Sequence, residues 1–512
     1  MLVKTYGAAV QGVKGTLVTI EVNVSAGIKF FLVGLPDNAV RESHERIMSA
    51  LQHNHIPIPH RQVVINMAPA NLRKEGSAYD LPLAVGMLAA NETIDATDLN
   101  KYMMMGELSL DGTLKPVKGV LPIAILAREH GFQGFIVPRE NSREAAVVNN
   151  LKVYGADNIV DIVDFLNHRK SLEPTIVNTR EEFYAHVEKF DIDFADVKGQ
   201  ENVKRAIEVA AAGGHNILMI GPPGAGKSMM AKRIPTILPP LTLSEALETT
   251  KIHSVAGKIE SGTSLIATRP FRSPHHTISD VALVGGGSFP QPGEISLAHN
   301  GVLFLDELPE FKRTVLEVLR QPLEDRRISI SRSKCAIDYP ASFMLVASMN
   351  PCPCGYYNHP TRQCTCAPGM VQKYLNRISG PLLDRIDMHI EIVPVPFEKL
   401  SDNTPVERSE TIRKRVIAAR DIQAERFKNE TGIYCNAQMS SKLLRKYAQP
   451  EADGMELLKA AMLRMNFSAR AYDRILKVAR TIADLANSPQ ITATHMSEAI
   501  NYRNLDRDGW GN

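Results

Sequence analysis

Residues 221–228 read Gly-Pro-Pro-Gly-Ala-Gly-Lys-Ser and match the G-x-x-x-x-G-K-S pattern of a loop that binds phosphate groups. Glycines in this pattern let backbone N–H groups turn toward the phosphates, while Lys227 supplies positive charge and the Ser228 hydroxyl suits Mg²⁺. A strand predicted at 216–220 and a helix predicted at 229–237 favour a nucleotide site over a chance glycine-rich turn. The residues expected to hold a nucleoside triphosphate are Gly221, Pro222, Pro223, Gly224, Ala225, Gly226, Lys227 and Ser228.

Two carboxylates follow a second apolar run. Residues 301–305 predict a buried strand, and Asp306 and Glu307 come directly after it. In an enzyme with a phosphate loop, the first carboxylate holds Mg²⁺ and the second orients or deprotonates the attacking water. A carboxylate at this point could instead cap a helix, but the loop upstream favours catalysis. We therefore expect Ser228 and Asp306 to ligate Mg²⁺ and Glu307 to act on water.

Two more polar residues border predicted strands. Asn350 ends the apolar run that starts at residue 343, where its amide could reach the γ-phosphate or the attacking water. Arg385 precedes the predicted strand 388–393, and an arginine at that place can reach the nucleotide of a neighbouring subunit. Taken alone, Arg385 would be interpreted as one half of a structural ion pair. The three matched elements before it favour the catalytic role.

Four of the six cysteines fall within fifteen residues. Cys352, Cys354, Cys364 and Cys366 can close a tetrahedral zinc site, although the C-x-C spacing is tighter than the usual one. The alternative is a set of buried thiols without metal, but the segment is too polar for a core. We predict a structural zinc ion rather than a catalytic one, because the four thiolates fill all four coordination positions.

Two segments carry basic residues that could contact DNA. Residues 326–338 alternate as a hairpin would, and residues 262–293 contain three consecutive glycines at 285–287. Positive charge in such segments suits a phosphate backbone, while the alternative is a solvated edge hairpin protected by charge. The adjacent His275 and His276, which should point opposite ways in an extended segment, are assigned turn or packing roles rather than metal binding. The DNA-contact candidates are Arg269, Arg272, Arg326, Arg327, Arg332 and Lys334.

The remaining chain indicates how these residues are positioned. Apolar strands alternate with helical patterns through the middle of the sequence, which predicts an α/β fold with a parallel sheet. Alternation at 16–24 predicts a half-buried strand, and 409–427 and 468–485 predict long helices, the second capped by Ser468. The 512 residues should form about three domains. No stretch is long and apolar enough to span a membrane, so we expect a cytoplasmic protein with no membrane partner.

The loop, the Asp-Glu strand, the Asn strand and the Asp384-Arg385 turn together resemble the AAA+ ATPases of the magnesium-chelatase-like branch. Arg272-Ser-Pro-His-His-Thr-Ile-Ser, Pro292-Gly-Glu-Ile-Ser and Asn350-Pro-Cys-Pro-Cys-Gly resemble the ComM (YifB) family in particular. The resemblance implies a homo-hexameric ring whose two basic segments line the pore. It also implies that Arg470 contacts the γ-phosphate from a helical lid, with Arg474 as the second choice. At position 326 the family usually carries glycine.

The first 170 residues resemble the proteolytic domain of Lon-type proteases, which use a Ser-Lys dyad. Ser77 takes about the place of the serine, but Ile123 stands where the family carries its lysine. Without a neighbouring base the hydroxyl is a poor nucleophile, so we predict the fold without protease chemistry. The expected division is a Lon-protease-like (ChlI-type) domain at 1–170, a linker at 171–193, the AAA+ domain at 194–395 and a C-terminal helical lid at 396–512.

The function that this resemblance implies is an ATP-hydrolysing, Mg²⁺-dependent ring motor that acts on single-stranded or branched DNA. Members of the family are understood as branch-migration helicases in recombination or natural transformation. One alternative is a chelatase-type ATPase subunit that remodels a protein partner. A second is an ATP-dependent protease, against which Ile123 argues.

Overall fold

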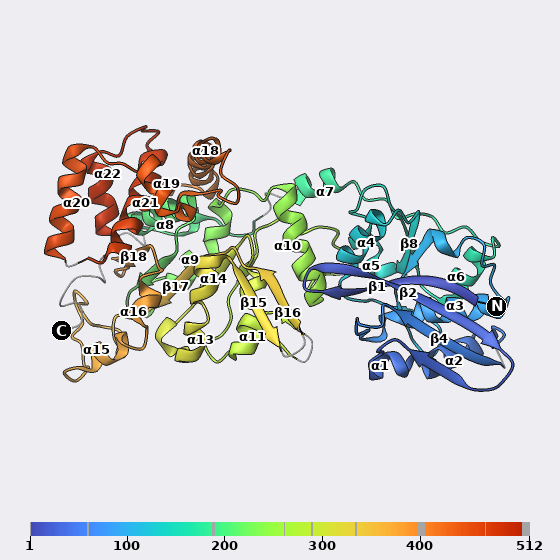
Figure 1. Cartoon of the computed structure of the whole chain (residues 1–512). Coiled ribbons are helices and arrows are strands. Elements are labelled where there is room, and N and C mark those ends of the chain that lie inside the picture. Colours follow the sequence, from blue (N-terminus) through green and yellow to red (C-terminus); the bar gives the residue numbers. More distant parts are fainter. Residues whose placement is uncertain are drawn as a thin grey trace. The chain divides into compact units, whose positions relative to one another are not determined.

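The computed structural model describes residues 2–58, 61–186, 190–260, 262–287, 290–332, 335–396, 405–465 and 467–503. The chain divides into two compact units, each made of two segments (Figure 1). The N-terminal unit comprises Met1–Val187 and Thr242–Ala267, and the ATPase unit comprises Glu188–Leu241 and Thr268–Asn512. Within the described part of the chain, no helix combines the length and the apolar character needed to cross a membrane.

A four-stranded sheet in the order β1-β2-β4-β3 begins the N-terminal unit. Along β2 (Lys14–Ser25), Val18, Ile20 and Val22 are buried and alternate with more exposed residues, which confirms the half-buried strand predicted at 16–24. Helix α3 (Asp80–Ala90) is buried at every position and packs on β1 and β2. The other elements are β1 Leu2–Gln11, β3 Phe30–Val33, β4 Gln62–Ala68, α1 Asn38–Arg41 and α2 Ser43–His53.

A second, parallel sheet in the order β5-β8-β9 completes the strands of this unit together with the short β6–β7 hairpin. Helix α7 (Thr179–His186) lies within the segment expected to be a linker, and the side chains of Arg143 and Glu182 form an ion pair that ties it to the unit. The other elements are β5 Tyr102–Met104, β6 Glu107–Leu108, β7 Leu114–Lys115, β8 Gly134–Pro138, β9 Lys152–Ala156, α4 Val120–Glu129, α5 Arg139–Ala145 and α6 Ile159–Leu166.

Helix α10 (Leu243–Ala256) follows the phosphate loop in the sequence but belongs to the N-terminal unit, where it packs on α4. The Ser254 carbonyl accepts a hydrogen bond from Gly119 N at 3.0 Å, and its hydroxyl donates to Glu144 Oε1 at 2.5 Å. The same carboxylate oxygen accepts from Leu121 N at 3.0 Å. The division expected from the sequence kept these residues within one ATPase domain, whereas the structure places 242–267 with the N-terminal elements.

The ATPase unit is built on a parallel sheet in the order β11-β14-β17-β10-β18. Strands β10, β14 and β17 are buried at every position, as continuous apolar runs predict for a sheet covered on both faces. This arrangement confirms the α/β class with a parallel sheet. The elements are β10 Ile217–Ile220, β11 Phe271–Arg272, β14 Val302–Leu305, β17 Met344–Met349, β18 Met388–Glu391, α8 Glu201–Gly213 and α9 Lys227–Ile237.

The C-terminal helices form one group, coloured red in Figure 1, in the same compact unit as the sheet. Helix α18 (Ser409–Phe427) has the predicted bounds, and α21 (Ala469–Leu485) begins after Ser468, whose side chain accepts a hydrogen bond from Ala471 N. Both helices pack against α8. The other helices are α19 Ser441–Tyr447, α20 Ala452–Arg464 and α22 Ala493–Asn501.

Two hairpins lie in the chain segments that connect strands of the large sheet. β15 (Arg327–Arg332) pairs with β16 (Cys335–Pro340) and confirms the hairpin predicted at 326–338. Within 262–293, the hairpin is β12 (Gly285–Gly286) with β13 (Gln291–Pro292). The short helices near the hairpins in the sequence are α11 Asp280–Val284, α12 Glu294–Leu297, α13 Arg313–Glu317 and α14 Arg320–Asp325, and α15 Met370–Leu375 and α16 Gly380–Leu383 follow β17.

Candidate active site

The register of three neighbouring strands brings the predicted nucleotide residues to one edge of the sheet. Ile220 of β10 lies opposite Met349 of β17, so the phosphate loop and Asn350 begin side by side. Leu305 of β14 lies opposite Ala347, so Asp306 and Glu307 also leave the sheet here. Ligands of open α/β sheets bind outside this carboxyl edge. The fold therefore places the three sequence motifs in one site.

Lys227, the first residue of α9, sits in the phosphate loop. Its ammonium donates hydrogen bonds to Gly221 O at 2.7 Å and Pro222 O at 2.9 Å, and to Asn350 Oδ1 at 3.1 Å. Burial lowers the pKa of Lys227, and the carboxylates of Asp306 and Glu307 oppose that effect. The structure thus brings Lys227 and Asn350 into contact, around a positive charge that anionic phosphates would neutralise.

Ser228 and Asp306 meet at the predicted magnesium position. The Ser228 hydroxyl donates to Asp306 Oδ2 at 2.7 Å, so the hydroxyl and carboxylate oxygens fit the ligands that Mg²⁺ prefers. The hydroxyl of Ser348 donates to the other oxygen, Asp306 Oδ1. Sequence reasoning missed Ser348 because its position beside Asp306 follows from strand register. The available signal was a serine near the end of an otherwise apolar strand.

Glu307 follows in a left-handed backbone conformation, with φ of 54°. Its N–H donates to Asp306 Oδ1 at 3.1 Å, and its Oε2 lies 3.4 Å from Nδ1 of His276. Sequence reasoning gave His276 a turn or packing role and missed this pairing. The expectation that His275 and His276 point opposite ways is wrong, because their ring centroids are 4.1 Å apart. The chain turns here, with Ile278 N donating to His275 O.

Arg385 follows α16 and is paired within its own chain. One guanidinium nitrogen lies 2.5 Å from Glu324 Oε1, and another donates to Pro381 O at 2.5 Å. The side chain is only 11% exposed. This is the ion pair that the sequence analysis kept as the alternative, and an action of Arg385 on a neighbouring subunit stays a prediction.

The two lid arginines differ in their surroundings. Arg474 donates to Oδ1 of the buried Asp387 at 2.8 Å, and Asp387 Oδ2 accepts from Asn216 N at 2.8 Å. Burial alone would raise the pKa of Asp387, but the Arg474 charge and a hydrogen bond with His215 lower it below its usual range. Arg470 is 62% exposed and lies 3.6 Å from Asp384. Arg474 thus has a structural contact, which leaves Arg470 the freer of the two to reach a nucleotide.

The basic candidates fall into two groups. Arg269 donates to the carbonyls of Pro239 and Asn300, and Arg272 forms a bidentate pair with Glu294 at 2.6 and 2.7 Å. These contacts give both arginines structural roles inside the ATPase unit, and DNA contact by them stays a prediction.

The basic hairpin has one buried face and one exposed face. Ile328 and Ile330 of β15 are buried, while Arg327 is exposed. Arg326 takes the left-handed conformation that the family's glycine would favour, with φ of 55°. Lys334 and the side chain of Arg332 lie outside the described residues.

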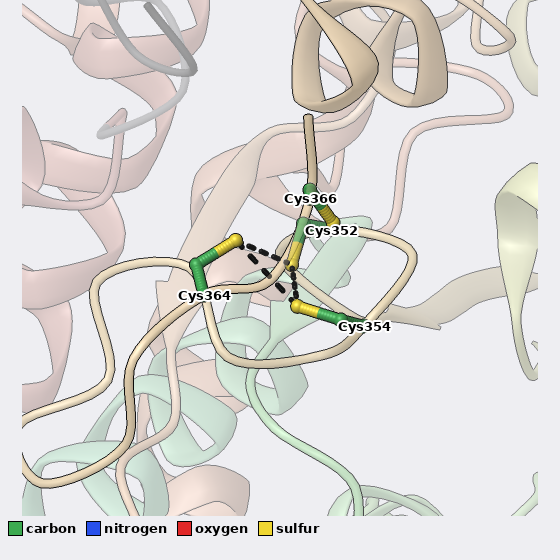
Figure 2. Close-up of side chains that lie close together, drawn as sticks. All are labelled: Cys352, Cys354, Cys364 and Cys366. Carbon is green, nitrogen blue, oxygen red and sulfur yellow. Dashed lines mark hydrogen bonds between the residues drawn. The ribbon is translucent and has the colours of Figure 1, made fainter. Parts of the chain in front are cut away.

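The four clustered cysteines converge in the structure. Figure 2 shows their sulfur atoms turned toward one another, and all four lie within 4.8 Å of each other. Cys352 Sγ is 3.3 Å from that of Cys354 and 3.8 Å from that of Cys364. Tetrahedral zinc with Zn–S bonds of about 2.3 Å requires sulfurs roughly 3.8 Å apart. Tyr357 N donates to Cys352 Sγ at 3.3 Å, a contact that favours a thiolate ligand. The donor set fits zinc.

The cysteine loop also packs on the phosphate loop. Gly355 has a φ of +84°, and a Cβ atom at this position would lie 2.6 Å from Cδ of Pro223. Cys352 is separated from Asn350 by a single residue. The cysteine loop therefore supports the nucleotide site from both the phosphate loop and the Asn strand.

In the N-terminal unit, the dyad expected of a Lon-type protease is incomplete. The Ser77 hydroxyl donates to the carboxylate of Glu107, and Ile123 is buried within α4 with 1% exposure. An apolar side chain at this position cannot accept the serine proton. These contacts support the prediction that the N-terminal unit has no protease activity, and it stays a prediction.

Three models of known protein families match this chain, and each covers a different segment. The family model described as "Magnesium chelatase, subunit ChlI" matches residues 193–400, "Subunit ChlI of Mg-chelatase" matches 20–141, and "Magnesium chelatase, subunit ChlI C-terminal" matches 406–503. The fold and the site thus define a magnesium-chelatase-like member of the AAA+ class.

Full-length relatives narrow this class further. The chain is 43% identical to "Competence protein ComM" of Haemophilus influenzae over 98% of the chain and 97% of the relative. It is 44% identical to the Escherichia coli protein YifB over 98% and 96%, and 39% identical to a Mycobacterium tuberculosis protein, Rv2897c, over 98% and 98%. The chain belongs to the ComM/YifB family.

The site geometry predicts separable effects for two substitutions. Lys227→Ala should abolish ATP binding because it removes the positive charge in the loop, whereas Glu307→Gln should retain binding and reduce turnover by at least about 100-fold. Nucleotide binding and phosphate release would be measured for each variant. Lys232→Ala, an exposed lysine on the same helix, is the control and should behave as the parent. Normal hydrolysis by Glu307→Gln would contradict the assignment.

Proposed function

We propose that the chain binds and hydrolyses ATP with Mg²⁺. The observation that carries this proposal is the meeting of Lys227, Asn350 and the Ser228–Asp306 pair at the carboxyl edge of one sheet. In this mechanism Lys227 and the loop amides hold the phosphates, and Ser228 and Asp306 ligate Mg²⁺. Glu307 orients or deprotonates water, and Asn350 orients the γ-phosphate or the water.

We further propose that the protein assembles as a hexameric ring that moves single-stranded or branched DNA. Support comes from near-complete coverage of a relative named for competence and from the exposed position of Arg327 on its hairpin. Such a motor would act as a branch-migration helicase in recombination or natural transformation. A cytoplasmic location would keep the four clustered cysteines reduced and able to bind metal.

The second candidate is a chelatase-type subunit that remodels a protein partner, which the three chelatase-derived family models favour. ATP hydrolysis measured with and without branched DNA separates the two, with Lys227→Ala as the inactive control. Stimulation by branched DNA supports the DNA motor. Indifference to DNA together with stimulation by a chelatase partner would support the remodelling subunit.

The zinc proposal predicts about one zinc ion per chain in protein purified without chelators. Cys364→Ser should lose the metal and lower the melting temperature, because metal binding and local folding are coupled. Cys435→Ser removes a buried cysteine outside the cluster and should keep the metal. Elemental analysis with no zinc in the parent protein would refute the site.

The ring proposal predicts that Arg385 acts across a subunit interface. Arg385→Ala should abolish turnover, and mixing it with Lys227→Ala should restore part of the activity, because some interfaces then pair an intact loop with an intact arginine. Glu324→Gln, which breaks only the ion pair within the chain, should retain turnover. Absence of recovery in mixed rings, or inactivity of Glu324→Gln, would favour a structural role.

The basic hairpin predicts a salt-dependent interaction with DNA. Replacing Arg327, Arg332 and Lys334 with alanine should weaken binding and reduce the slope of log affinity against log salt by about one for each phosphate that is no longer neutralised. Basal ATP hydrolysis should survive, because the groups that act on the nucleotide come from other segments. Lys459→Ala on α20 removes an exposed charge elsewhere and should leave affinity unchanged. Equal affinities for the triple variant and the parent at two salt concentrations would remove the hairpin from the mechanism.

A further inference from the structure

The cysteine loop, residues 351–369, has few structural elements of its own. All of its residues are described, and they form no helix or strand. After Gly355 none of them is buried, whereas the four cysteine sulfurs converge on one point (Figure 2). In a segment of this kind, metal ligation takes the place of a hydrophobic core. The conformation of the cysteine loop therefore depends chiefly on the four thiolates.

Gly355 is the residue through which the cysteine loop meets the phosphate loop. Its backbone is tied to the cluster, because Gly355 N donates a hydrogen bond to Cys352 O at 3.0 Å and Cys354 precedes it directly. Its φ of +84° lies in the left-handed region that glycine favours. A Cβ atom at this position would lie 2.6 Å from Cδ of Pro223, so Gly355 approaches Pro223 more closely than a residue with a side chain could. These contacts connect the thiolates to the phosphate loop.

A small pocket shows that the two loops face each other beyond this contact. Tyr357 and His359 of the cysteine loop line the pocket together with Gly221 and Pro222 of the phosphate loop. Tyr357 is also connected to the cluster, since its N–H donates to Cys352 Sγ at 3.3 Å. The cysteine loop therefore adjoins the first half of the phosphate loop over several residues.

The ends of the cysteine loop are held by residues that belong to the candidate site. Asn350, which accepts a hydrogen bond from Lys227 Nζ at 3.1 Å, directly precedes it. Arg377, which follows α15, donates to Pro309 O at 3.3 Å and to Glu310 Oε2 at 2.9 Å. The cysteine cluster thus controls the middle of the segment, where Gly355 contacts Pro223, while other contacts hold its two ends.

The phosphate loop depends on outside contacts to hold its backbone. Such a loop binds phosphate through backbone N–H groups, so a backbone held in the binding conformation gives a higher affinity. Gly224 and Gly226 take positive φ values of 79° and 88°, and a Cβ atom at Gly224 would meet no atom within 4 Å. Contact of Gly355 with the neighbouring Pro223 therefore restrains a part of the loop that has little packing of its own.

We propose that Gly355 is a positioning residue for the phosphate loop, held against Pro223 by the thiolates of the cysteine cluster, so that zinc binding and nucleotide binding strengthen each other. The inference rests on the proposed ATP site and deepens it, because it gives the cysteine cluster an effect on nucleotide affinity as well as on local stability. Coupling between two binding equilibria is reciprocal, so each ligand raises the affinity for the other by the same factor.

The experiment measures the zinc affinity of the full chain by competition with a chelator of known zinc affinity, in excess Mg²⁺, with and without a saturating non-hydrolysable ATP analogue. Zinc should bind about five- to tenfold more tightly with the analogue, at the low end of couplings between sites. Affinity for the analogue should fall by the same factor when the chelator has removed the zinc. Cys435→Ser, which changes a cysteine outside the cluster, should show the same coupling as the parent.

Two variants test the route of the coupling. Pro223→Ala removes the ring that Gly355 contacts and keeps all four clustered cysteines, so the analogue should no longer change its zinc affinity. The coupling factor is a ratio, and a change that Pro223→Ala makes to nucleotide affinity itself therefore cancels. In Lys227→Ala the analogue should also leave zinc affinity unchanged, because an effect there would come from zinc bound by the analogue in solution.

The outcomes separate this inference from the proposed function. Equal zinc affinities with and without the analogue in the parent would overturn the inference and leave the ATP site standing. Coupling that persists in Pro223→Ala would overturn it as well, since zinc would then act through general stability rather than through Gly355. The same holds for a shift in Lys227→Ala as large as that of the parent, or for a parent chain that binds no zinc. A parent chain that binds zinc but no analogue would refute the proposed ATP site, and the inference with it.

Discussion

The hydrogen-bond register of β10, β14 and β17 is the constraint on which the candidate site depends. These strands bury every residue, so the close packing of their side chains against the helices on both faces opposes a change of register. A one-residue slip of β14 against β17 would move Asp306 away from Ser348 and turn the strand's side chains to the other face. The same register holds Asn350 beside the phosphate loop. Hydrophobic burial in the sheet thus sets the positions of polar groups at its edge.

The lid is joined to this sheet by a second buried interaction. Asp387, at the start of β18, accepts hydrogen bonds from Asn216 N before β10 and from Arg474 on α21. Burying the Asp387 carboxylate without a partner would cost free energy of folding, and the Arg474 guanidinium and the Asn216 N–H offset that cost. The interaction fixes α21, and with it Arg470, relative to the starts of β10 and β18. Helix α21 therefore has a rigid base at Arg474, and the exposed Arg470 lies one turn away from it.

Local sequence signals predicted the elements but not all of their partners. The phosphate loop, the strand before Asp306 and helix α18 each carry a pattern within a few residues, namely glycine spacing, a continuous apolar run or a polar cap. Ser348 and His276 entered the site through strand register, which depends on contacts between residues distant in the sequence. Helix α10 shows the same limit at a larger scale. The capping box of Thr242 and Glu245 marks the start of a helix, but only the Ser254–Glu144 and Ser254–Gly119 hydrogen bonds show which unit it completes.

The order of segments along the chain explains how a partner could influence hydrolysis without touching the nucleotide. The segment at 273–293 lies between Lys227 and Asp306, the basic hairpin lies between Glu307 and Asn350, and the cysteine loop follows Asn350 directly. Each of these segments is therefore connected at one or both ends to a strand that ends in the site. A strand buried on both faces transmits displacement at its end rather than absorbing it by bending, because its packing is close to that of a crystal. Displacement of these segments would thus reach the polar residues where the strands leave the sheet, which are the residues proposed to hold phosphate, metal and water.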